Sequence, residues 1–185
     1  NLVQKVGQLF VVQAFSNKGV SHSKKISNEI INNAIGGLIF SNGSPKKQIN
    51  LTNSYQELSN IPLLIGMDAE WGLSMRLDST FSFPWNMTLG AIKDDMLIKQ
   101  VGSRIATHCK RIGVNFNFAP VVDINTNPNN PIIGNRSFGE SIENVSLKSL
   151  NFMKGQQEMN VLSSAKHFPG HGDTSTDSHK TLPII

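Results

Sequence analysis

The sequence predicts an α/β fold, a (β/α)8 TIM-type barrel of which roughly the first five strand–helix units are present. Short apolar runs alternate with longer amphipathic segments, which is the pattern of strand–helix units. Polar residues rarely interrupt the apolar runs, as expected for parallel strands buried on both faces. Ionisable residues follow several runs directly, as at the mouth of a barrel, and no glycine-rich phosphate loop indicates a doubly wound sheet instead.

The expected strands are β-branched or aliphatic and are bounded by glycine, proline or polar clusters. They cover residues 7–13, 36–41, 61–69, 114–124 and 161–168. The expected helices cover residues 24–34, 46–59, 95–112 and 143–159. In the third helix, apolar side chains recur every three or four residues and predict one buried face: Met96, Ile98, Val101, Ile105 and Cys109.

Composition limits the classes of protein and partner. With 185 residues and 38% hydrophobic content, the chain is long and apolar enough for one domain with a buried core. The net charge of +4 comes from scattered lysines without interleaved aromatic residues, so we expect no nucleic-acid partner. No apolar stretch is long enough for a membrane span, and the single cysteine, Cys109, excludes an internal disulfide.

Four side chains at separate strand ends are predicted to converge. Asp68 follows the third strand, Lys166 and His167 end the fifth, and Arg136 stands on a glycine-bounded loop after the fourth. The carboxyl ends of barrel strands meet at one mouth, so these side chains belong to one pocket. A carboxylate there can bind sugar hydroxyls, and a buried lysine needs a partner or a ligand. The alternatives are a helix-capping Asp68 and a structural salt bridge for Arg136.

Three nearby features have structural interpretations. Trp71, in the run GMDAEWG (66–72), can stack on a sugar face or pack against the protein. Asp123, in APVVDIN, is predicted to hold loop amides at the barrel rim. The Phe168–Pro169 peptide bond is expected to be cis, since it lies in a tight loop at a strand end.

The stretch AKHFPGHGDTSTDSH (165–179) concentrates three of the five histidines. Its proline and glycines predict a loop, and in an extended loop Asp177 and His179 share a face. A carboxylate beside an imidazole fixes its tautomer and suits it to general acid–base catalysis near neutral pH. The alternatives are a hydrated surface loop or a metal site, although the spacing of the candidate ligands matches no compact metal motif. Those candidates are His167, His171, Asp173, Asp177 and His179.

The runs KHFPGHGDTSTDSH, MDAEWGLSMRLD, FAPVVDIN and RSFGE together resemble glycoside hydrolase family 3, in its β-N-acetylglucosaminidase (β-N-acetylhexosaminidase) branch. The resemblance implies a retaining enzyme that needs no metal or other cofactor. It implies that His179 is the general acid/base and that Asp177 orients it. It also implies that five residues bind the sugar in the −1 subsite: Asp68, Arg76, Arg136, Lys166 and His167. In the motif usually written Asp-x-Glu-Gly-Gly, Trp71 replaces a glycine.

The resemblance also implies how residues 1–185 relate to a whole enzyme. They would be the N-terminal portion of a single barrel domain, ending before the strand that carries an aspartate nucleophile. We therefore expect further C-terminal sequence and no activity from residues 1–185 alone. The expected substrate is a terminal β-linked GlcNAc on a peptidoglycan fragment or a chitooligosaccharide. The resemblance favours a bacterial protein of the periplasm or cell envelope over a cytoplasmic one.

Two other functions stay open on the residues alone. One is a metal-dependent barrel hydrolase that uses the histidine and aspartate cluster at 167–179. The other is a sugar-binding barrel that has the sugar ligands and lacks a nucleophile.

Overall fold

A computed structural model describes residues 1–184 and shows one parallel sheet of five strands in the order β1-β2-β3-β4-β5. The strands are β1 (Val11–Ala14), β2 (Gly37–Phe40), β3 (Leu64–Met67), β4 (Phe116–Asn117) and β5 (Leu162–Ser163). The spatial order follows the chain order without reversal, which is the topology of a barrel segment and not of a doubly wound sheet. The predicted fold class is therefore confirmed.

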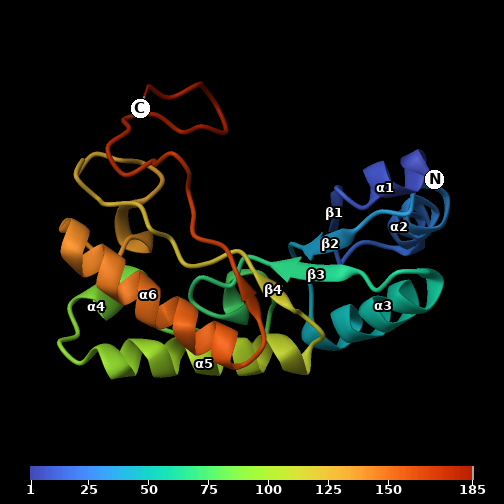
Figure 1. The fold of residues 1–185 in the computed structure, drawn as a ribbon, viewed down its shortest axis with the longest axis horizontal. Helices are drawn as coiled ribbons and strands as arrows, with labels where there is room; N and C mark the ends of the chain where they lie inside the picture. Colours follow the sequence, from blue (N-terminus) through green and yellow to red (C-terminus); the bar gives the residue numbers. More distant parts are fainter. Residues whose placement is uncertain (185) are drawn as a thin grey trace.

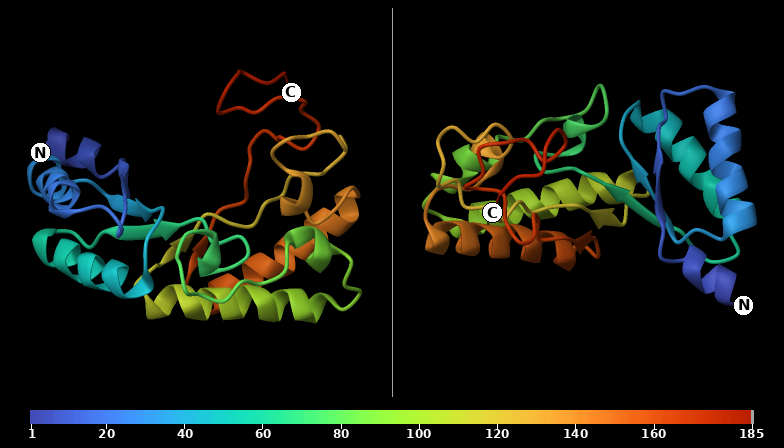
Figure 2. Two further views of the ribbon diagram at one scale, coloured as in Figure 1. Left: turned by 180° about the vertical axis from the view of Figure 1, so that it is seen from behind. Right: turned by 90° about the horizontal axis from the view of Figure 1, so that it is seen from above.

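The helices cover the outer side of the sheet (Figure 1). They are α1 (Leu2–Gly7), α2 (Val20–Asn33), α3 (Pro45–Leu58), α4 (Asn86–Gly90), α5 (Asp95–Arg111) and α6 (Ile142–Glu158), with short 3-10 turns at Leu73–Met75 and Gly134–Arg136. In both views of Figure 2, α2 and α3 lie beside β1 to β3, while α5 and α6 run together beside β4 and β5. None of the helices described over residues 1–184 has the length and apolarity needed to cross a membrane.

Two glycines let α5 and α6 approach each other closely. A Cβ atom on Gly102 would lie 2.2 Å from the Phe152 carbonyl oxygen, and one on Gly155 would lie 2.0 Å from the Lys99 carbonyl oxygen. Backbone therefore meets backbone where these helices cross. The predicted buried face of α5 is present at Ile98, Ile105 and Cys109, whereas Met96 of the same predicted face is 54% exposed.

The four predicted long helices are confirmed to within a few residues, but the predicted strands were too long. The segment expected at 114–124 forms regular strand only over Phe116–Asn117, because Pro120 has no amide hydrogen to donate to a ladder. In the segment expected at 7–13, regular strand begins only at Val11, since Gly7 is the last residue of α1.

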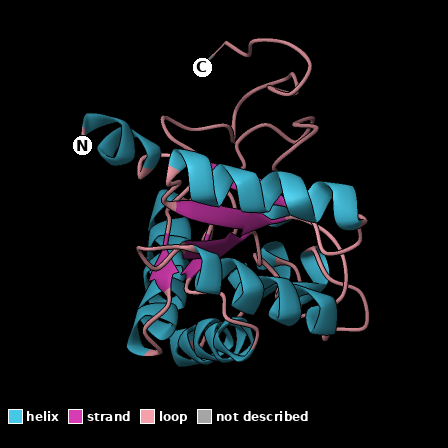
Figure 3. Cartoon of the chain, turned by 90° about the vertical axis from the view of Figure 1, so that its right-hand side faces the viewer, coloured by secondary structure: helices cyan, strands magenta, loops and turns pink. Residues whose placement is uncertain are grey.

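Because all pairings in the sheet are parallel, the strand carboxyl ends lie at one edge of it. In Figure 3 the long loops extend from one side of the molecule, beyond the helices and strands. The residues that follow β4 and β5 rise together on that side, and Val121 pairs with Lys166 in an isolated parallel bridge. In this region three peptide bonds are cis: Ala119–Pro120, Lys166–His167 and, as predicted, Phe168–Pro169.

Candidate active site

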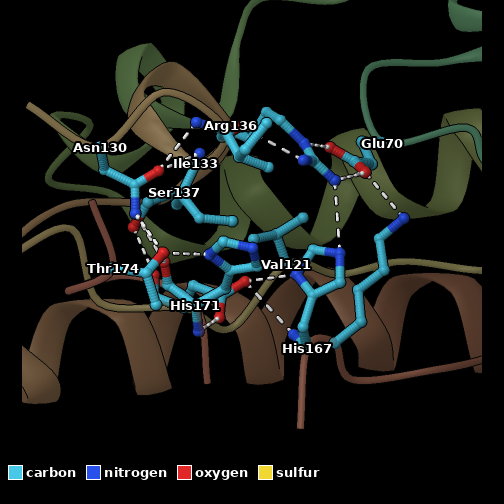
Figure 4. A network of polar contacts seen from close by, with 12 residues as sticks. Glu70, Val121, Asn130, Ile133, Arg136, Ser137, His167, His171 and Thr174 are labelled. Carbon is cyan, nitrogen blue, oxygen red and sulfur yellow. Dashed lines mark hydrogen bonds and ion pairs between the residues drawn. The ribbon is translucent and has the colours of Figure 1, made fainter. Parts of the chain in front are cut away.

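The centre of the candidate site is Glu70, a carboxylate with no exposed surface. It receives two hydrogen bonds from Arg136, from Nε to Oε2 at 3.0 Å and from Nη2 to Oε1 at 2.8 Å. The Lys166 ammonium lies 2.7 Å from the same Oε1. Figure 4 shows the Arg136 side chain directed toward Glu70. A fully buried carboxylate is stable only when such partners replace water, so Glu70 holds the two cations in fixed positions.

Lys166 also connects Glu70 to Asp68. Its Nζ donates to Asp68 Oδ1 at 2.8 Å, while Arg76 Nη2 donates to the other carboxylate oxygen, Oδ2, at 2.5 Å. These four residues come from the loop after β3 and from the segment that follows β5. The ends of β3 and β5, which lie on either side of β4, therefore supply one continuous chain of ion pairs.

Asp123 is the third carboxylate of the site. Its Oδ2 accepts from the His167 ring Nδ1 at 2.6 Å and from the His167 amide at 3.2 Å, and its Oδ1 accepts from the His171 amide at 2.7 Å. The prediction that Asp123 holds loop amides is confirmed. Because Nδ1 faces the carboxylate, the Nε2 atom of His167 lies toward Arg136, 3.5 Å from Nη2.

The backbone around Arg136 is also fixed. The side-chain amide of Asn86, the first residue of α4, donates to the Arg136 carbonyl oxygen at 2.7 Å. The guanidinium Nη1 donates to the Ile132 carbonyl oxygen at 3.2 Å. The short 3-10 turn that carries Arg136 is thus tied to α4 on one side and to its own loop on the other.

Opposite charges decide the ionisation of the three carboxyl groups. Burial alone would raise the pKa of each, but cations and hydrogen bonds outweigh it and hold the pKa below the ordinary value. For Asp68 the main opposing group is Lys166, for Glu70 Arg136, and for Asp123 His167. Near neutral pH, therefore, all three are anions.

The cluster is balanced in charge without any ligand. Three carboxylates, at Asp68, Glu70 and Asp123, accompany three permanent cations, at Arg76, Arg136 and Lys166. A site with equal numbers of both signs favours a neutral ligand with many hydroxyl groups, since each hydroxyl can donate to a carboxylate and accept from a cation. Sugars have this chemistry.

The structure brings together the four side chains expected to converge, Asp68, Arg136, Lys166 and His167, and Arg76 joins them through Asp68. The sequence pattern predicted no role for Glu70, which lies in the run GMDAEWG. Its position two residues after Asp68 was the available signal. An open cavity of about 450 Å³ adjoins the site between segments 122–126 and 165–173, and Asp123 and His167 are part of its wall.

The predicted Asp177–His179 pair is formed, but it lies apart from this cluster. Asp177 Oδ1 lies 2.8 Å from His179 Nδ1 and also accepts from the His179 amide at 2.8 Å. That amide, followed by the imidazole, lowers the pKa of Asp177. The carboxylate engages Nδ1, so Nε2 is the ring atom left for proton transfer.

His179 is 81% exposed, on a C-terminal segment that stands away from the sheet (Figure 1). Within residues 1–184, no hydrogen bond or ion pair joins Asp177 or His179 to the cluster around Glu70. The structure therefore places the sugar-ligand candidates together and the proton-transfer candidates outside them.

Trp71 has the packing role that was one of its two interpretations. Its ring lies 4.2 Å from that of Trp85, with the planes tilted by 47°. The Trp71 carbonyl oxygen accepts from the Phe83 amide at 2.9 Å. Since Trp85 directly precedes Asn86, this pair supports the loop that holds Arg136.

The histidine cluster of the sequence does not become a ligand set in space. Over residues 1–184, no three side chains of His, Cys, Asp or Glu lie close enough together to bind one metal ion.

Comparison with known proteins identifies the family of the chain. The family model described as the glycosyl hydrolase family 3 N terminal domain matches residues 1–185. Beta-hexosaminidase A of Pseudoalteromonas piscicida is 42% identical over an alignment of 147 residues, and the match covers 74% of this chain and 25% of that protein. A beta-hexosaminidase of Neisseria meningitidis serogroup C (strain 053442) is 35% identical over an alignment of 167 residues, and the match covers 83% of this chain and 45% of that protein.

Among solved structures, the family 3 β-N-acetylglucosaminidase of Paenibacillus sp. str. FPU-7 superposes with a TM-score of 0.91 at 37% identity. The match covers 100% of this chain and 36% of that one. The chain thus spans less than half the length of each of these relatives. The matched family model, which extends over all 185 residues, shows that the chain belongs to glycoside hydrolase family 3.

Proposed function

We propose that the protein containing this chain is a retaining exo-β-N-acetylglucosaminidase that removes terminal β-linked GlcNAc. The observation that carries the proposal is the pairing of two sites. One is a charge-balanced cluster suited to sugar hydroxyls, and the other is an Asp–His pair with one ring nitrogen free for proton transfer. Relatives named β-hexosaminidases support the choice of sugar.

In this proposal the cluster around Glu70 binds the terminal sugar ring. Lys166, Arg136 and His167 donate to hydroxyl oxygens, and Asp68 accepts from hydroxyl groups, with Arg76 holding Asp68 in place. Glu70 is too deeply buried to touch the sugar and acts by positioning the two cations.

His179 is the proposed general acid and base. Protonated at Nε2, it donates that proton to the glycosidic oxygen as the bond to the anomeric carbon breaks and a carboxylate attacks that carbon. The neutral ring then takes a proton from water, whose oxygen attacks the anomeric carbon and releases the carboxylate. Asp177 keeps the Nδ1 hydrogen in place and stabilises the imidazolium form.

This mechanism also requires a nucleophile and a movement of the segment that carries His179. The attacking carboxylate is assigned to a part of the protein beyond residues 1–185. The segment that carries Asp177 and His179 must also move over the cluster when sugar is bound, because no contact now joins them.

The test is to supply the full-length protein with aryl β-GlcNAc, aryl β-glucoside and the disaccharide of β-linked GlcNAc. We expect release of GlcNAc from the first and third, with the β-anomer formed first, as followed by proton NMR. Initial release of the α-anomer would contradict a retaining mechanism. Equal turnover of the aryl glucoside would contradict the proposed sugar specificity. The natural substrate is proposed to be a peptidoglycan fragment or a chitooligosaccharide. Comparing the rates of GlcNAc release from these two substrates shows which of them the enzyme prefers.

A further inference from the structure

The loop that carries Asp177 and His179 changes character at Thr174. Up to this residue the loop is bonded to the segment 125–133, and His171 and Thr174 are only 6% and 2% exposed. Beyond it, Ser175 and Thr176 are exposed, and within the described part of the chain residues 175–184 form hydrogen bonds only with one another. Thr174 therefore marks the boundary between a fixed part and a free part.

Two asparagine side chains hold the fixed part by its backbone. Asn127 Nδ2 donates to the carbonyl oxygens of Asp173, at 3.2 Å, and of Thr174, at 3.1 Å. Asn130 Nδ2 donates to the His171 carbonyl oxygen at 2.6 Å and to the Thr174 hydroxyl at 3.4 Å (Figure 4). The two bonds from Asn130 are buried, and buried bonds are costly to break without water to replace them.

The hydrogen bonds that join residues 171–174 to Asn127 and Asn130 are called the anchor here. The Thr174 hydroxyl lies at its centre. It contacts the His171 ring at Nδ1 and donates to the His171 carbonyl oxygen at 3.1 Å. The other ring nitrogen of His171 is buried and meets no hydrogen-bond partner in the part of the chain that the structure describes. The contact with Thr174 is thus the polar contact that orients the His171 ring there.

The anchor is also connected directly to the sugar-ligand cluster. The His171 amide donates to Asp123 Oδ1, and the other oxygen of that carboxylate binds the ring of His167. Between these residues and Thr174, Gly172 lies so close to the loop after β4 that a Cβ atom would be 1.8 Å from the Ile124 carbonyl oxygen. The position of Thr174 is therefore fixed relative to His167.

We propose that Thr174 is a positioning residue, which fixes the point from which the Asp177–His179 segment reaches the bound sugar. This inference rests on the proposed function. From Thr174 to His179 the chain spans at most ~17 Å, so a fixed Thr174 confines the imidazole to a small volume beside the cluster. If the anchor opens back to His167, the tether grows from five residues to twelve. The local concentration of the His179 imidazole at the bound sugar falls as roughly the −3/2 power of tether length. The rate of proton transfer should therefore drop about 4-fold.

The experiment uses the full-length enzyme and compares T174V, which keeps the shape and removes the hydroxyl, with T174S, which keeps the hydroxyl. N127A/T174V also removes the two bonds that the Asn127 side chain donates to the loop. The measured quantity is kcat/KM for a GlcNAc conjugate with a poor leaving group and for a dinitrophenyl glycoside whose leaving group needs no proton. We expect T174V to lose about 4-fold or more on the first substrate and less than about 2-fold on the second. T174S should keep kcat/KM on the first substrate near the wild-type value. The double variant N127A/T174V should lower it further than T174V does.

Amide hydrogen exchange supplies a readout besides activity, since residues 171–174 should exchange faster in T174V than in T174S. The positioning role would be overturned if T174V lost kcat/KM equally on both substrates. It would also be overturned if T174V kept kcat/KM although the amides of residues 171–174 exchanged faster. H179A, measured in parallel, separates the proposed acid/base role of His179 from the proposed positioning role of Thr174. If H179A shows no dependence on the leaving group, the proposed acid/base is wrong. If H179A shows that dependence and T174V does not, only the role of Thr174 is overturned.

Discussion

The cluster around Glu70 and the Asp177–His179 pair carry the two halves of one proposed reaction, yet they are built in opposite ways. The cluster lies on strand ends, is largely buried, and joins segments far apart in sequence: Arg136 and Glu70 are 66 residues apart. The pair lies on an exposed loop, and its partners are two residues apart.

The difference follows from what each group has to do. Sugar hydroxyls have fixed relative positions, so their ligands gain from being held rigidly before the sugar arrives. A proton carrier must meet the glycosidic oxygen only after binding, and a loop allows substrate and product to pass. Changes in the cluster should therefore alter stability together with activity, whereas changes in the pair should alter activity alone.

The largest expected effect is on activity, at the exposed pair. In the full-length enzyme, H179A should lower hydrolysis of a GlcNAc conjugate with a poor leaving group by about 10²- to 10⁴-fold, since general acid catalysis contributes that much. The loss in kcat/KM should be much smaller for an activated aryl glycoside. D177A should act in the same direction but less severely, because the proton carrier remains. Initial rates on both substrates check this, and wild-type rates in H179A would remove the pair from the mechanism.

The next effect is on stability, at the buried cluster. E70Q removes the charge that faces Arg136, while Lys166 keeps Asp68 as a partner. Breaking a buried pair from one side costs 3–5 kcal/mol in general. Because Arg136 and Lys166 keep 20% and 15% side-chain exposure, we expect the free energy of unfolding to fall by about 3 kcal/mol, at the low end of that range.

The matched control is E158Q, the same substitution in an exposed ion pair with Lys99. Glu158 is 59% exposed, so the change should alter the free energy of unfolding by no more than about 0.5 kcal/mol. Chemical denaturation of the two full-length variants measures both values. A similar small change in each would show that Glu70 is not a central support of the cluster.

The sequence predicted the convergence of Asp68, Arg136, Lys166 and His167, because parallel strands in chain order must deliver their carboxyl ends to one rim. It could not predict the role of Glu70. That role depends on the burial of a carboxylate between two cations, one of them 66 residues away, and local patterns do not contain such distances.

The errors at strand ends have a related cause. Apolar runs such as 114–124 continue past the regular ladder because these residues remain buried, and Asn117 side-chain bonds to Ala69 replace part of the backbone pairing. The short helices α1 and α4 were not predicted, since neither is long enough to show a helical period. The approach of Asn127 and Asn130 to the loop at 171–174 depends on tertiary contact alone.

A smaller effect should appear in the pH dependence of stability. The pKa values of Asp68, Glu70 and Asp123 are lower in the folded protein than ordinary values, so the folded state binds fewer protons. Their contribution to the free energy of unfolding is complete above about pH 5. It is lost as the pH falls below about 4, toward the pKa values of these groups in the folded state. Unfolding midpoints of wild type and E70Q should therefore converge as the solution is acidified. A constant difference between pH 7 and pH 3 would contradict the assignment for Glu70.

The smallest expected effect sharpens the comparison most. D177A and H179A should leave the thermal midpoint of the full-length protein unchanged, although they remove a side-chain hydrogen bond at 2.8 Å. His179 is 81% exposed, so water replaces its partner at little cost, and the contact links only neighbours on one loop. Calorimetry of both variants beside E70Q tests this at neutral pH. A clear drop in the midpoint for either variant would mean that the pair rests on the body of the protein, and the proposed division between a rigid binding cluster and a free proton carrier would then fail.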